Sequence, residues 1–359
     1  MDAATTNGAP ALGFGFSFAD LAEREALVRL DHLFLDRLNA EDQDLQVRLL
    51  AARADPGSLN AKQEGELIVA LGPHLQMLIG SLFGIEPELR AISGHTEQLD
   101  PIHVCKRHFV QRQAVKKFPD PSGFDAAALS AALEERLGSD LTERGFAIGV
   151  ADWEKQGDAA ALDLAMRYAA WATLTEAGHD AHPGNTLFRV PHKLDFQHLV
   201  PTETIERNGV RMLRLPPGRW RHRDGFGLTD PGMNDQQALD QMNYCIWCHE
   251  QSKDSCSKGL RDRKTGAFQK SVFGVTLAGC PLDEKISEMH QQRAHGCLIG
   301  AFATIAIDNP MMAATGHRIC NDCMKACIYQ KQDPVDIPQA ETAILRDVLA
   351  LPWGFEIYS

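Results

Sequence analysis

Eight of the nine cysteines in this 359-residue chain lie in its last third, and the spacing of seven of them limits what that part can fold into. They include two Cys-x-x-Cys pairs, with single cysteines between and after the pairs. Cysteines that only pack as small hydrophobic side chains do not gather in this way, so the pattern predicts a metal-binding region. The seven are Cys245, Cys248, Cys256, Cys280, Cys320, Cys323 and Cys327.

Composition and charge indicate the compartment of the protein and the kinds of partner that it would bind. A hydrophobic fraction of 44% is ordinary for a soluble globular protein, and no apolar run reaches the roughly 18 residues of a membrane span. Met1 to Pro10 lacks a secretory signal, so we expect a cytoplasmic protein without a membrane partner. Net charge is −12, and the basic residues are dispersed except for a run from Arg211 to Arg223. We therefore expect no nucleic-acid partner.

Hydrophobic periodicity predicts a mainly α fold. Leucines recur at helical spacing between Phe18 and about Ile92, and alanine- and leucine-rich amphipathic segments follow a break at 118–123. The last of these segments ends at Gly178, which is typical of a C-terminal helix cap. Residues 1–180 are therefore expected to form a helical domain of unknown role.

A change of composition follows this helical part. Residues 181–234 are rich in Pro, Gly and His, and residues 200–215 contain a predicted β-hairpin that turns at Asn208-Gly209, a pair favoured in type I′ turns. From Asp235 onward the pattern is helical again, with cysteines at helix ends and in short loops. We expect 181–234 to be a junction and 235–359 to be a separate helical, cysteine-rich domain.

The cysteine spacing favours iron–sulfur clusters over zinc. A 4Fe–4S cluster needs about four thiolate or equivalent ligands, and a Cys-x-x-Cys turn presents two of them to neighbouring irons. Two such pairs could instead form one structural zinc site, but this would leave three cysteines of the group unused. A thioredoxin-like redox pair would need a preceding strand, which neither pair has. Seven thiols and one carboxylate fit two clusters best, and a zinc-stabilised interaction module without a redox role is the alternative.

The cysteines belong to three longer stretches. These are CIWCHEQSKDSCSKG with GCPLDEKISEMH after an interruption, then GAFATIAIDNPMMAATGHRICNDCMKAC, and finally DPVDIPQAE. The arrangement resembles the N-terminal iron–sulfur domain shared by the glutamate synthase small subunit and dihydropyrimidine dehydrogenase. The resemblance covers about residues 235–350 and implies an α-helical ferredoxin-like fold. Residues 260–279 are an insertion relative to that family, which can loop out if its ends stay close together.

The resemblance also implies a ligand set. The first 4Fe–4S cluster would take Cys245, Cys248, Cys256 and Cys327. The second cluster would take Cys280, Cys320, Cys323 and Glu341, where Glu341 follows from aligning a tail position that is Gln or Glu in the family.

Members of that family continue into a module that binds FAD and NAD(P)H. This chain shows no G-x-G-x-x-G turn of the kind such a module uses. The resemblance therefore implies an electron-transfer domain or subunit of an NAD(P)H- and flavin-dependent oxidoreductase, without a complete active site of its own. Its flavin module would be joined in cis or bound in trans.

Two other groups of residues are expected to be structural. Cys297 lies in an apolar helical stretch and is most simply a packed core thiol. His95, His103, Cys105 and His108 form a loose group that we expect to be surface and core residues of a helix. No motif in residues 1–230 indicates a named chemistry.

Overall fold

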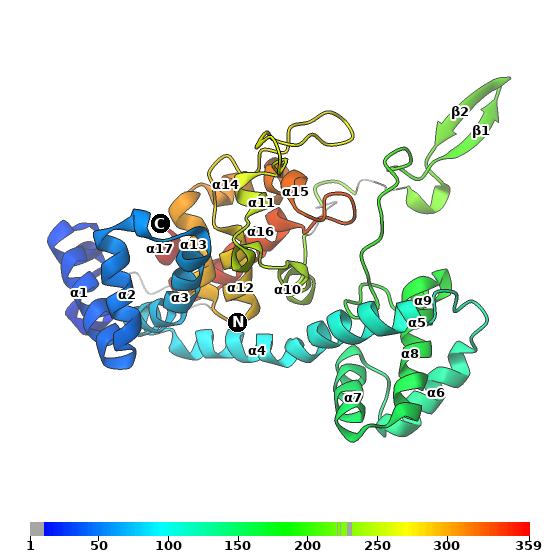
Figure 1. The fold of residues 1–359 in the computed structure, drawn as a ribbon, viewed down its shortest axis with the longest axis horizontal. Helices are drawn as coiled ribbons and strands as arrows, with labels where there is room; N and C mark the ends of the chain where they lie inside the picture. Colours follow the sequence, from blue (N-terminus) through cyan, green and yellow to red (C-terminus); the bar gives the residue numbers. More distant parts are fainter. Residues whose placement is uncertain (1–10, 221, 223, 228–231) are drawn as a thin grey trace.

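The computed structural model describes residues 11–220, 222, 224–227 and 232–359. Over these residues the protein is mainly helical, with one small antiparallel sheet of two strands, which confirms the predicted class (Figure 1). The N-terminal segment Met1 to Pro10, and Arg221 and Arg223 of the basic run, lie outside the described residues.

The N-terminal helices pack side by side at one end of the molecule. Asn60 begins the third helix with a capping box to Gln63, and Gly84 ends it in a left-handed conformation at φ 67°. The next helix has Pro87 in its first turn, where a proline costs no helical hydrogen bond. These helices are α1 (Arg24–Glu41), α2 (Gln43–Ala54), α3 (Ala61–Phe83) and α4 (Glu86–Cys105).

Helix α4 runs from this end to a second helical lobe (Figure 1). It continues without a break into a π-helix, η4 (Lys106–Ala114), around which the lobe packs its own apolar core. The other helices of the lobe are α5 (Val115–Lys117), α6 (Ala126–Leu137), α7 (Glu143–Gln156), α8 (Ala159–Leu174) and α9 (Glu176–Ala181).

The predicted helix end at Gly178 was wrong. Helix α8 ends at Leu174, and Thr175 caps the start of α9 by accepting a hydrogen bond from the Gly178 backbone N–H. A Cβ atom at Gly178 would lie 2.4 Å from the Trp171 carbonyl oxygen. This glycine is therefore needed for the close approach of two helices, which composition alone does not distinguish from a cap.

The predicted β-hairpin is confirmed. Strands β1 (Glu203–Arg207) and β2 (Val210–Arg214) pair antiparallel. Asn208 and Gly209 both have positive φ, at 54° and 75°, as a type I′ turn requires. The hairpin projects from the rest of the chain (Figure 1).

The cysteine-bearing part folds onto the N-terminal helices. Its central helices share a core with the ends of α3 and α4, in which Leu82 and Leu89 lie with Leu298 and Ile344. Its longer helices are α10 (Asp235–Tyr244), α12 (Ile286–Ala294), α13 (Leu298–Asp308), α14 (Met312–Ile319) and α16 (Ile337–Leu349). Its short helices are η6 (Cys248–Gln251), α11 (Ser255–Lys258), α15 (Asp322–Ala326) and α17 (Gly354–Tyr358).

One of the described helices, α3, is long and apolar enough by length and composition to cross a membrane. Its apolar residues are interrupted by Pro73 and His74, so no continuous run was apparent in the sequence. A core helix of a globular domain meets the same criterion. In this fold α3 packs against α12 and α13, and its Glu64 forms an ion pair of 2.6 Å with Lys285.

Candidate functional site

Four buried cysteines from separate segments line one small cavity. Cys245 follows α10, Cys248 begins η6, Cys256 lies in α11 and Cys327 follows α15. These are the four residues that the family resemblance assigned to a first cluster. We call Cys245, Cys248, Cys256 and Cys327 the first group.

Backbone N–H groups point at the sulfurs of the first group. The Trp247 N–H donates to Cys245 Sγ at 3.4 Å, because Trp247 adopts a left-handed conformation inside the Cys-x-x-Cys turn. The Ser255 N–H donates to the sulfur of Cys248, and the Tyr329 and Val335 N–H groups donate to that of Cys327. Such donors stabilise a thiolate, which is the form that binds a metal.

The remaining predicted ligands lie together in a second group. Cys280 opens the loop after the insertion, Cys323 lies in α15 and Glu341 lies in α16. Charges at Cys280, Cys320 and Glu341 all act on the Cys323 thiol. Cys320 is half-buried and the other three are buried. We call Cys280, Cys320, Cys323 and Glu341 the second group.

A second carboxyl group, Glu284, lies beside Glu341 and was missed in the sequence. The two side chains share a hydrogen bond, and Asn309 also bonds to Glu284. Burial raises the pKa of both carboxyl groups, and the charge of Glu284 adds to the effect on Glu341. Glu284 follows the Cys280-Pro281 step by only three residues, but nothing in that spacing distinguishes it from a solvated glutamate.

The insertion leaves the two groups adjacent. The backbone N–H of Cys280 donates to the carbonyl of Cys256 at 2.8 Å, so the ends of residues 260–279 stay together as expected. Gly279 has φ 86°, and a Cβ atom there would lie 2.5 Å from the backbone N of Gly259. We call this contact between the two ends of the insertion, at Gly259 and Gly279, the neck. It holds one predicted ligand of each group, Cys256 and Cys280, side by side.

Burial sets the protonation of the thiols. It raises the pKa of Cys248 and of Cys280 to about 11, and it raises the pKa values of Cys245, Cys256, Cys323 and Cys327 as well. Without a bound cation these thiols are protonated at neutral pH. A metal bound here would displace their protons, and its positive charge would offset the cost of the buried thiolates.

The chain has a relative that covers most of its length. It is 30% identical over 301 residues to uncharacterized protein RP005 of Rickettsia prowazekii (strain Madrid E), which covers 79% of this chain and 98% of RP005. The chain belongs to the RP005 family. A family model described as the RP005 N-terminal alpha-helical domain matches residues 12–84, and thus ends where Gly84 caps α3.

A second relative from the same organism matches a short part of this RP005-family chain. Uncharacterized protein RP006 of Rickettsia prowazekii (strain Madrid E) is 73% identical over 48 residues, which is 13% of this chain and 7% of RP006. RP006 is therefore a much longer protein than the matched segment. No solved structure matches the chain.

A zinc site and an iron–sulfur cluster would need different spacings of the sulfurs in this RP005-family protein. Across the described residues, no three His, Cys, Asp or Glu side chains lie close enough to hold a single metal ion. Four thiolates on one zinc, with Zn–S of about 2.3 Å, would bring the sulfurs to roughly 3.8 Å from one another. The thiolates of a 4Fe–4S cluster bind four different irons and lie further apart.

One buried histidine faces the first group and was also missed in the sequence. His290 in α12 is 0% exposed and lines the same cavity as the four cysteines, and neither of its ring nitrogens has a hydrogen-bond partner among the described residues. Burial lowers the pKa of His290 to about 3, so the ring is neutral and carries one N–H. A cluster in this cavity would supply sulfur acceptors for that N–H.

The other cysteines lie outside both groups. Cys297 is buried near Gly72 and Gly300, as expected for a core thiol. Cys105 is buried in the core of the second lobe. The first group, the second group and His290 therefore contain the residues whose chemistry fits iron–sulfur clusters.

Proposed function

We propose that this RP005-family protein binds two 4Fe–4S clusters and transfers electrons between redox partners. The observation that carries the proposal is the cavity shared by the four cysteines of the first group, which come from segments up to 82 residues apart in the sequence. Core packing alone gives no reason for four thiols to converge on one cavity and for backbone N–H groups to point at their sulfurs.

The first group would hold one cluster and the second group the other. Clusters of this kind accept and donate single electrons at a potential set by their ligands, hydrogen bonds and burial. Residues of this chain would determine that potential. Ile286, Ile328 and Val335 line the cavity of the first group with apolar surface, which limits access of water. The hydrogen bond between Cys280 and Cys256 keeps the two groups close enough to act in series.

A zinc-stabilised interaction module is the competing function, and the structure gives it less support. A structural zinc ion uses four ligands, so one zinc site would leave three of the seven clustered cysteines unused. One zinc site would also leave the buried Glu284–Glu341 pair without a function.

The electron partner is proposed to be a flavin module that is reduced by NAD(P)H. This follows from the resemblance of residues 235–350 to iron–sulfur domains that work beside such a module.

The deciding experiment is the content of iron, zinc and acid-labile sulfide per chain, measured on protein purified without oxygen. We expect about eight irons and eight sulfides, with a broad brown visible absorption. Zinc without sulfide would overturn the electron-transfer proposal and support the interaction module.

A further inference from the structure

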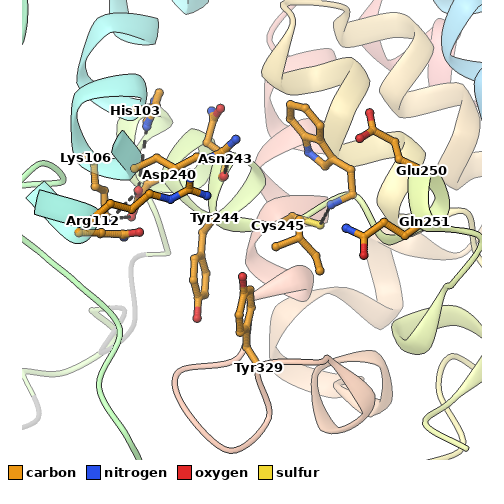
Figure 2. A pocket seen from close by; sticks show the side chains of 14 residues that line it. His103, Lys106, Arg112, Asp240, Asn243, Tyr244, Cys245, Glu250, Gln251 and Tyr329 are labelled. Atoms are coloured by element: carbon orange, nitrogen blue, oxygen red, sulfur yellow. Dashed lines mark hydrogen bonds and ion pairs between the residues drawn. The ribbon is translucent and has the colours of Figure 1, made fainter. Parts of the chain in front are cut away.

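A polar cavity of about 490 Å³ lies between the N-terminal half of the chain and the first Cys-x-x-Cys turn. Figure 2 shows residues of α4 and η4 on one side of it and residues of α10, with Cys245, on the other. Its volume is within the range of small-molecule sites, about 300 to 1,000 Å³. None of the proposed cluster ligands except Cys245 lines it.

The π-helix determines which side chains form one wall. In an α-helix, residues five apart point in different directions. The wider winding of a π-helix, with hydrogen bonds from i to i+5, brings them onto one face. Lys106 and Arg107, and five residues later Gln111 and Arg112, accordingly all line the cavity. Short π-helical segments frequently occur at functional sites.

Two of the three cations on this wall already have partners. Lys106 donates to both carboxylate oxygens of the buried Asp240, at 2.6 and 2.7 Å. Arg107 donates to the Asn243 carbonyl and lies over the Trp247 ring. Arg112 is exposed, and within the described part of the chain it has neither a hydrogen bond nor an ion pair. It is the cation available to a ligand.

A buried histidine in the same wall also lacks a partner. His103 is 5% exposed and lines the cavity, and neither of its ring nitrogens is hydrogen-bonded in the described structure. Its Nδ1 lies 4.0 Å from the nearer Asp240 oxygen, which is too far for a hydrogen bond. A buried polar group of this kind is costly unless a ligand or water bonds to it.

The opposite wall is aromatic. The rings of Tyr244 and Tyr329 are stacked, with centroids 4.6 Å apart and an interplanar angle of 11°, and both residues line the cavity (Figure 2). The acidic Glu250 at this side accepts a hydrogen bond from Gln291, and Asp240 is neutralised by Lys106. The cavity therefore combines an unpaired cation, unbonded polar atoms and a planar aromatic surface.

We propose that this cavity binds a small phosphate-bearing ligand of the nucleotide class. The phosphate is held by Arg112 and Gln111, His103 hydrogen-bonds to the ligand, and the base packs against the tyrosine pair. A guanidinium is suited to phosphate because it offers several donors in a fixed plane. Free inorganic phosphate carries the same anionic group but has no planar ring, so binding of a nucleotide and binding of phosphate can be distinguished by experiment.

The position of the cavity gives the ligand a regulatory role, which rests on the proposed function. Cys245 belongs to the wall of the cavity and also to the first group. Reduction adds negative charge to a cluster held there, so a bound anion opposes reduction of that cluster. By linkage, reduction must weaken binding of the anion by the same factor.

The test is calorimetric titration of the full-length protein with ADP and, separately, with inorganic phosphate. We expect saturable ADP binding that Arg112→Ala weakens about tenfold or more, the effect of losing a charged hydrogen bond. Arg112→Lys should recover part of the loss because it restores the charge. Arg90→Ala is the matched control, since Arg90 is another exposed arginine on the same continuous helix.

Each outcome is informative. Binding of ADP but not phosphate supports a nucleotide site, and phosphate that binds as tightly as ADP would reassign the cavity to a simple anion and overturn the nucleotide class. Absence of ADP binding, or equal binding by wild type and Arg112→Ala, overturns the proposal. Iron and sulfide are measured on the same preparations. If the protein binds ADP but contains no iron, only the cluster function is refuted. If it contains iron but does not bind ADP, only this site is refuted.

Discussion

The two ligand groups lie next to each other but differ in what surrounds their thiols. The first group has four buried cysteines around a largely apolar cavity, which His290 also lines, and Cys256 Sγ donates to the Asp254 carboxylate at 3.5 Å. The second group has three cysteines, one of them half-buried, and the buried Glu341, beside which the buried Glu284 lies. The predicted ligands of the first group are therefore all thiols, whereas those of the second group include a carboxyl group.

This difference has consequences for two bound clusters. A carboxylate donates less electron density to iron than a thiolate does, which changes the potential of a cluster, and exposure and hydrogen bonds change the potential further. Two clusters in these groups would therefore differ in potential, although they lie close together. The comparison can be tested first at the contact that the groups share, and then in each group separately.

The largest effect is expected from Gly279→Val, at the neck between the groups. The new side chain would meet the Gly259 backbone N and the Ser257 carbonyl oxygen at 2.5 Å, in a backbone conformation with φ 86°. We expect displacement of Cys280 from Cys256 and loss of most iron from both groups, measured as iron per chain. Gly274→Val is the control, because it carries similar strain of about 1 to 3 kcal/mol at φ 77° but has open space around it. Full iron in Gly279→Val would show that the neck does not hold the groups together.

The next largest effect is expected from Cys248→Ser, which affects the first group alone. Serine keeps the shape of the side chain but is a much poorer ligand for iron, so about four of about eight irons should be lost. The spectrum of the second cluster should persist. Cys297→Ser is the matched control, because Cys297 is equally buried but lies outside both groups. Equal iron in the two variants would refute the ligand assignment.

The parts of this structure that could be predicted follow from local chemistry. Asn208-Gly209 specified the hairpin turn because few residue pairs tolerate two positive φ angles. Cys-x-x-Cys was recognised as a ligand pair because it is a local turn. The joining of Cys256 and Cys327 to the first such pair, and the choice of Glu341, came instead from the family resemblance.

The parts that could not be predicted depend on long-range packing. His290 and Glu284 are polar residues in helical or loop sequence, and only the fold brings them to the cysteines. Gly178 looked like a cap because a glycine needed for helix contact has no separate pattern in sequence. The nine-residue π-helix η4 was also missed, since its residues Lys106 to Ala114 continue the periodicity of α4 closely enough to be taken for an α-helix.

A more selective effect is expected from carboxyl substitutions in the second group. Glu341→Ala should weaken binding of the second cluster about tenfold or more and change its paramagnetic resonance spectrum after reduction. The spectrum of the first cluster should be unchanged. Glu284→Ala is the matched variant, because the two carboxyl groups share a hydrogen bond. If Glu284→Ala abolishes the second signal and Glu341→Ala leaves it intact, the oxygen ligand is Glu284.

The smallest effect is expected from His290→Leu, which tests one polar neighbour of the first group. An N–H donor to a cluster sulfur stabilises the reduced, more negative state, so its removal should lower the potential of the first cluster. A differential hydrogen-bond energy of about 1 kcal/mol corresponds to roughly 40 mV for a one-electron couple. The measurement is a redox titration followed by paramagnetic resonance, with iron content as the check that the cluster is intact. His290→Gln keeps a donor and should restore much of the shift. A potential that is the same in wild type and His290→Leu, at full iron content, would mean that His290 does not bond to the cluster.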